Sequence, residues 1–137
     1  MRGAWLAMTL LLCGCSAPKS KNTQIRVNEL FDQGGQYSVL LRSSYCSQCS
    51  ALQKDVRMPG KGFYTINIDE FAVYDYFAYS SNVKEAKEKS IGATSVSEIN
   101  FVAAPLILEI EDKAIKGYFC GYAECKEYLE GGINHAS

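Results

Sequence analysis

The chain has 137 residues, a formal net charge of −1 and 47% hydrophobic residues. This length suits one small domain with a real core, so we expect no second domain. Because 14 basic residues face 15 acidic ones, the charge provides nothing to attract nucleic acid, and we expect no nucleic-acid partner.

The first fifteen residues predict an export signal. Arg2 supplies a short positive region, and the apolar stretch 4–12 that follows is too short to span a bilayer. The run Leu12-Cys13-Gly14-Cys15 resembles a bacterial lipoprotein signal, which implies lipidation of Cys15 as the first residue of the mature chain. The alternative is an ordinary cleaved signal peptide with incidental cysteines.

The lipoprotein interpretation divides the chain into three parts and implies a location. We expect a signal peptide over residues 1–14, a polar tether over 15–22 and a folded domain over 23–137. The protein would then be lipid-anchored at a bacterial cell membrane, on its extracytoplasmic face.

Beyond the tether, the apolar periodicity predicts alternating helices and strands. The strand–helix–strand order around residue 50 implies two parallel strands, and a later hairpin adds antiparallel ones. The sequence therefore predicts an α/β fold with a central mixed β-sheet flanked by helices. The expected elements are helices over residues 25–33, 46–57, 83–91 and 125–129, strands over 37–41 and 63–69, and a hairpin of 106–110 with 115–119.

Cys46 and Cys49 form a Cys-x-x-Cys pair between the first expected strand and the helix that follows it. The free N–H groups and positive dipole end of a helix N-terminus stabilise thiolate over thiol, which indicates that Cys46 is the nucleophile. Cys49 lies one turn further on the same face, close enough to resolve a mixed disulfide. The alternatives are an inert structural disulfide or half of a zinc site.

Two motifs resemble the thioredoxin superfamily, over about residues 25–130. One is Cys46-Ser47-Gln48-Cys49 at a strand-to-helix junction, and the other is Ala103-Ala104-Pro105-Leu106-Ile107-Leu108, which is similar to the family's small residue, cis-proline and apolar strand. The resemblance implies a thioredoxin-like fold, a cis Ala104–Pro105 bond beside Cys46, and substrate binding by Tyr45, Ala104 and Pro105. Bacteriocin transport accessory proteins have a similar layout.

The sequence also departs from that family. Tyr45 stands where the family has tryptophan, and Leu40 stands where it has a buried strand carboxylate, so no obvious internal base serves Cys49. The dipeptide Ser47-Gln48 lacks both the proline of reducing members and the histidine of strongly oxidising ones, which leaves the redox direction open. The interval from Cys49 to Pro105 is longer than in thioredoxin, which suggests an insertion over residues 70–81.

Cys120 and Cys125 complete the four thiols that remain once Cys13 leaves with the signal and Cys15 carries lipid. An even number of thiols in an exported protein favours disulfides. A short loop over 121–124 would let the two sulfurs meet at disulfide distance. We expect either a structural second disulfide or an auxiliary redox pair that exchanges with Cys46.

The remaining candidates are weaker. A zinc site would need all four cysteines to converge, so we predict no metal, and nothing in the sequence implies a cofactor. His135 lies in a polar tail, where a solvated side chain is expected. Tyr74, Tyr76 and Tyr79 form either a partner surface or the half-buried packing of the inserted segment.

Taken together, these features predict a membrane-tethered thiol-disulfide oxidoreductase that acts on exported thiol or disulfide proteins and exchanges with an unidentified redox partner. The alternative is a noncatalytic thioredoxin-like lipoprotein that serves as a binding module, with structural disulfides only. Exposure of Cys46 separates the two, because a reactive pair exposes its first sulfur and a structural disulfide buries both.

Overall fold

The computed structural model describes residues 23–132. The predicted signal peptide, the tether, the lipidation site Cys15 and His135 lie outside the described residues.

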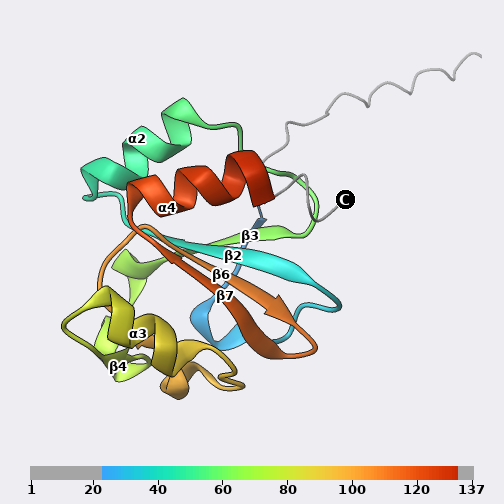
Figure 1. Ribbon diagram of the computed structural model, residues 1–137, viewed down its shortest axis with the longest axis vertical. Helices are drawn as coiled ribbons and strands as arrows, with labels where there is room; N and C mark the ends of the chain where they lie inside the picture. Colours follow the sequence, from blue (N-terminus) through green and yellow to red (C-terminus); the bar gives the residue numbers. More distant parts are fainter. Residues whose placement is uncertain (1–22, 133–137) are drawn as a thin grey trace, which may run out of the picture.

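A five-stranded mixed sheet forms the centre of the domain (Figure 1). The strand order is β1-β3-β2-β6-β7; β1, β3 and β2 run parallel, and β6 is antiparallel to both β2 and β7. A two-stranded sheet pairs β4 with β5. The α/β architecture with a central mixed sheet is therefore confirmed. The strands are β1 Thr23–Gln24, β2 Tyr37–Arg42, β3 Phe63–Asn67, β4 Ala78–Tyr79, β5 Asn100–Phe101, β6 Leu106–Glu111 and β7 Ala114–Cys120.

Helices cover both faces of the large sheet (Figure 1). The helices α2 and α4 lie on one face, and α3 lies on the other with β4 beside it. The α-helices are α2 Ser47–Asp55, α3 Val83–Ser90 and α4 Tyr122–Glu127, which continues as a π-helical turn over Tyr128–Gly132. Short 3-10 turns are η1 Val27–Glu29, η2 Ile68–Glu70, η3 Val73–Asp75 and η4 Val96–Glu98.

The sheet separates two apolar cores, because side chains alternate between its faces. Along β2, Val39 and Leu41 enter the core on the α3 side, whereas Leu40 enters the core under α2 and α4. This second core is the smaller one, and it forms the floor beneath the Cys-x-x-Cys helix. Its buried members are Leu40, Leu52, Val56, Phe63, Ile107, Cys125 and Leu129.

Two of the expected helices differ from the structure. The predicted helix over residues 25–33 is wrong, because only the single 3-10 turn η1 forms there. Val27 and Leu30 are both buried, and their three-residue spacing suits a 3-10 turn as well as an α-helix. The last helix begins at Tyr122 and not at Cys125, so the expected loop over 121–124 is absent.

The predicted hairpin is confirmed, with longer strands and a tighter turn. Glu111 of β6 pairs with Ala114 of β7, which leaves only Asp112 and Lys113 between the strands. Both residues have positive φ, 55° and 62°, as a two-residue type I′ turn requires.

The segment expected to be an insertion, residues 70–81, contains η3 and β4. Phe77 is buried and Phe71 packs against the same core, as the packing interpretation requires. Tyr74, Tyr76 and Tyr79 are nevertheless exposed, at 50%, 42% and 68% of their surface. The aromatic segment is thus half core and half surface.

Candidate active site

Cys46 is the N-cap of α2, one position before the first helical turn. Its Sγ accepts a hydrogen bond from the Cys49 N–H at 3.0 Å, and its carbonyl accepts one from the Ser50 N–H at 3.1 Å. Cys46 and Cys49 are joined by a disulfide with their Cα atoms 5.2 Å apart. A backbone N–H aimed at this sulfur stabilises negative charge on it once the pair is reduced.

The two cysteines differ in access to solvent. Cys46 is partly exposed, whereas Cys49 retains only 1% of its surface. The preceding Tyr45 is 89% exposed, so its ring does not cover the Cys46 sulfur by packing into the domain. This asymmetry is what a nucleophilic first thiol and a protected second thiol require.

The segment before β6 meets the Cys46 sulfur. The Ala104–Pro105 peptide bond is cis, as the resemblance implied, and the Ala104 carbonyl oxygen lies 3.6 Å from the Cys46 Sγ. The Gly121 N–H donates to the Pro105 carbonyl at 2.8 Å, and Leu106 is fully buried in β6. Segments distant in the sequence thus meet beside the disulfide, and the predicted cis bond and the predicted position of the Ala104 backbone beside Cys46 are confirmed.

Asp69 is a residue of this site that sequence reasoning missed. Its carboxylate accepts hydrogen bonds from the Ser43 hydroxyl at 2.6 Å and from the Ser44 N–H at 2.8 Å, in the turn that leads to Cys46. The Ser43 hydroxyl lowers the pKa of Asp69, with the Ser44 N–H adding to the effect. A signal was available, since Asp69 closes a strand expected to run parallel to β2, and the ends of neighbouring parallel strands adjoin.

A second missed contact links the two helices of this face. The Gln48 side-chain oxygen accepts a hydrogen bond from the Tyr122 N–H at 3.2 Å, and the Tyr122 hydroxyl donates to Asp55 at 2.6 Å. Gln48 lies between the two cysteines, so its side chain connects α2 to the start of α4. These contacts span more than sixty residues of sequence, and no local pattern reports them.

The core beneath α2 is apolar at Leu40, the position at which the thioredoxin superfamily has a buried strand carboxylate. Leu40 is 1% exposed and packs with Leu52 of α2, Ile107 of β6 and the thiol of Cys125.

The predicted disulfide between Cys120 and Cys125 is wrong, because both are free thiols. Cys120 packs with the core on the α3 side, its sulfur 3.5 Å from the Ala103 carbonyl, whereas Cys125 is buried in the core under α4. The sheet therefore lies between the two side chains, since α4 begins directly after Gly121 and turns Cys125 to the other face.

The protonation of these thiols also argues against an auxiliary redox pair. Burial raises the pKa of Cys120 and raises that of Cys125 to about 12. Both stay protonated at neutral pH, and the thiol form is a poor nucleophile.

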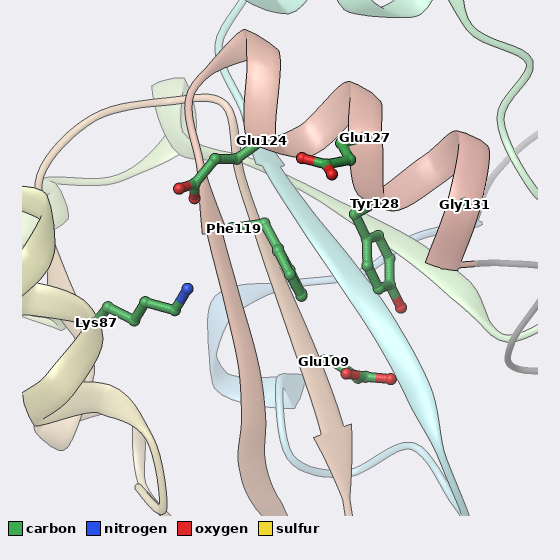
Figure 2. Close-up of a pocket in the computed structure, with 7 residues that line it drawn as sticks. All are labelled: Lys87, Glu109, Phe119, Glu124, Glu127, Tyr128 and Gly131. Carbon is green, nitrogen blue, oxygen red and sulfur yellow. The ribbon is translucent and has the colours of Figure 1, made fainter.

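A separate groove of about 540 Å³ opens beside α4, away from the thiol pair. Figure 2 shows the Phe119 and Tyr128 rings side by side in its lining, where they stack with their centroids 4.5 Å apart. The groove includes none of the predicted site residues. The residues that line it are Lys87, Glu109, Phe119, Glu124, Glu127, Tyr128 and Gly131.

Two further structural findings bear on function. Among residues 23–132, no group of three or more His, Cys, Asp or Glu side chains could hold a metal ion. Over the same part of the chain, no helix is long and apolar enough to cross a membrane.

Solved thioredoxins have a similar fold. The thioredoxin of Malassezia sympodialis (Mala s 13) matches with a TM-score of 0.52 and 17% identity, over 87% of this chain and 93% of that one. Spinach chloroplast thioredoxin f in its short form matches with a TM-score of 0.51 and 13% identity, over 86% of this chain and 96% of that one. Oxidised mitochondrial thioredoxin 3 of Saccharomyces cerevisiae matches with a TM-score of 0.48 and 19% identity, over 83% of this chain and 94% of that one.

No protein-family model matches the sequence, and no curated protein matches it. The similarity to solved structures therefore concerns the fold, which is thioredoxin-like. At the start of its first long helix this fold carries a Cys46–Cys49 disulfide, an arrangement that suggests thiol–disulfide redox chemistry.

Proposed function

We propose that the protein is a membrane-tethered thiol–disulfide oxidoreductase that acts on exported proteins through Cys46 and Cys49. One observation carries the redox part of this proposal: Cys46 is partly exposed and its sulfur accepts the Cys49 N–H, while Cys49 itself is buried. A purely structural disulfide needs neither the exposure nor the hydrogen bond, whereas a nucleophile needs both.

The chemistry proceeds by two exchanges. The Cys46 thiolate attacks one sulfur of a partner disulfide; the partner S–S bond breaks, a Cys46–partner S–S bond forms, and the second partner sulfur leaves and takes up a proton. Cys49 then loses its proton to water and attacks the Cys46 sulfur, which forms the Cys46–Cys49 disulfide and releases the partner as a dithiol. Two electrons pass to the partner, and the same steps in reverse oxidise a dithiol partner.

The residues around Cys46 suit an extended polypeptide. The exposed ring of Tyr45, the residue before Cys46, offers an apolar contact to a partner, and the Ala104 carbonyl lies beside the Cys46 sulfur. Ala104 is small and partly exposed, so a partner backbone can approach it and pair with it in the manner of a strand. A dithiol or disulfide redox partner then returns Cys46 and Cys49 to their starting state.

The rival function is a noncatalytic binding module. That hypothesis expects both cysteine pairs to be structural disulfides with buried sulfurs, but Cys120 and Cys125 are free and Cys46 is partly exposed. These observations favour the oxidoreductase.

Trapping of mixed disulfides tests the redox proposal. Cys49→Ser should accumulate covalent complexes between Cys46 and exported proteins, because the resolving thiol is missing. Cys46→Ser is the matched control and should trap few, since Cys49 is buried. The readout is a non-reducing gel, on which trapped complexes migrate as high-mass bands that disappear on reduction. Equal, negligible trapping by both variants would favour the binding module.

The tether requires its own test. Cys15→Ser should abolish lipidation and release the domain in soluble form, because burial of acyl chains, at about 0.8 kcal/mol per CH₂, is what would hold the protein at the bilayer. Mass analysis that found an unmodified mature N-terminus beyond Cys15 would contradict the lipoprotein interpretation.

A further inference from the structure

We infer that Asp69 is a positioning residue for Cys46: its carboxylate holds the turn over residues 43–46, here called the redox turn, so that the Cys46 sulfur faces the Cys49 N–H. The inference deepens the proposed function, because it concerns the same thiol. Asp69 does not contact the sulfur itself and acts through the turn.

Hydrogen bonds to one carboxylate organise the redox turn. Asp69 accepts from the Ser43 hydroxyl at 2.6 Å and from the Ser44 N–H at 2.8 Å. The Ser43 oxygen in turn accepts the Tyr45 N–H at 3.0 Å, and the Ser43 carbonyl accepts the Cys46 N–H at 3.3 Å. Each N–H from Ser44 to Cys46 is therefore bound by Asp69 directly or by Ser43, the residue that Asp69 orients.

Apolar packing does not hold the middle of the redox turn. Ser44 is exposed and Tyr45 is 89% exposed, so neither side chain anchors the turn in a core. Polar contacts must therefore supply the order that apolar packing supplies elsewhere. Cys46 ends the turn and is the N-cap of α2, so a change in the turn moves the Cys46 sulfur.

Asp69 itself is held in place. It lies in η2, directly after β3, and its N–H donates to the Asn67 side-chain oxygen at 3.0 Å. Asn67 pairs in register with Arg42, the last residue of β2, so the sheet aligns Asp69 with the start of the redox turn. The Arg42 charge also favours the ionised carboxylate.

A competing account makes the opposite prediction. If the charge of Asp69 acted on Cys46 mainly by repelling its thiolate, then Asp69→Asn would make the thiolate easier to form. Removal of the Ser43 hydroxyl would then change little, because it leaves the charge in place. If Asp69 acts by geometry, both substitutions make the thiolate harder to form.

The test measures the pH midpoint of Cys46 alkylation by iodoacetamide, read by mass spectrometry, in a reduced Cys49→Ser background that leaves the backbone N–H intact. Asp69→Asn and Ser43→Ala should each raise the midpoint by about one pH unit, which is about a tenfold loss of thiolate below the midpoint. Asp75→Asn is the control, since it removes the same charge from an exposed residue of the neighbouring η3 and should leave the midpoint unchanged.

The combined Asp69→Asn and Ser43→Ala variant should have the midpoint of either single variant, because both break one network. An unchanged or lowered midpoint in Asp69→Asn overturns the inference, even if thermal unfolding shows lost stability. Ser43→Ala removes a single hydroxyl and keeps the test decisive if Asp69→Asn does not fold. Alkylation needs no partner protein, so this result and the trapping result of the proposed function are independent.

Discussion

Gly117→Ala offers a demanding test of the packing between the hairpin and α4. Gly117 is buried in β7, and a Cβ added there would lie 2.8 Å from the Phe119 ring and 2.8 Å from a carboxylate oxygen of Glu109. Both distances are shorter than side chains tolerate, so a neighbour must move. The Glu109 carboxylate is the end of a flexible side chain and moves at little cost, whereas the Glu109 Cβ, 3.1 Å from the added Cβ, must shift by a few tenths of an ångström.

The contact with the Phe119 ring decides how much stability Gly117→Ala costs. It stacks on Tyr128 with centroids 4.5 Å apart, and the Tyr128 and Ser38 hydroxyls are hydrogen bonded at 2.6 Å. Overpacking costs about 1 to 3 kcal/mol, while replacing glycine recovers about 0.4 to 1 kcal/mol through the unfolded chain. The difference spans about 0 to 2.6 kcal/mol, so we expect Gly117→Ala to lower the free energy of unfolding by about 1.3 kcal/mol, the middle of that range.

Urea unfolding of the oxidised protein, followed by circular dichroism, measures this change. Gly60→Ala is the matched control, because nothing lies within 4 Å of a Cβ there and its backbone has no positive φ. The control should be neutral or slightly stabilised. If Gly117→Ala proved as stable as Gly60→Ala, the stacked geometry of Phe119 over Gly117 would be refuted.

Three predictions concern pH. Reduced Cys46 should alkylate with a midpoint about one to two pH units below the free-thiol value of about 8.5, since a hydrogen bond to a charged group is worth about 1.5 to 3 kcal/mol; the same midpoint in folded protein and in urea would contradict this. Burial raises the pKa of Cys125 to about 12, so its contribution to stability is complete below about pH 8.5 and is lost as pH rises toward 12. As pH rises, the free energy of unfolding of Cys125→Ala should fall less steeply than that of the wild type, and parallel falls would be evidence against the raised pKa of Cys125. Hydrogen bonds from Ser43 and Ser44 lower the pKa of Asp69 from 3.8, so its contribution is complete above that value and is lost as pH falls through the folded pKa. Acid titration should therefore destabilise the wild type more than Asp69→Asn, and equal acid sensitivity would contradict the carboxylate's role.

The elements around the redox pair could be predicted because their signals are local. A buried apolar run, a Cys-x-x-Cys pair and a helix-breaking Pro59-Gly60 lie within twenty-five residues, and they correspond to β2, α2 and the turn before β3. The placement of Pro105 beside Cys46 depended on resemblance to a known family, because fifty-eight residues separate Ala104 from Cys46.

The errors arose where one spacing fits two structures. Val27 and Leu30 are three residues apart, which suits both an α-helix and the 3-10 turn that forms. Cys120 and Cys125 are close in sequence, but a strand that ends and a helix that begins between them turn their side chains to opposite faces of the sheet. Proximity in sequence does not determine which face a side chain joins.

The sequence by itself indicated the thiol pair at the start of a helix, the strands β2 and β3 on either side of that helix and the hairpin of β6 with β7, because each depends on a few neighbouring residues. The tertiary structure alone decided that Cys46 is accessible while Cys49 is not, that Asp69 binds the redox turn and that Gln48 meets Tyr122. These contacts join residues brought together only when parallel strands align their ends and α2 packs beside α4, so no local periodicity encodes them.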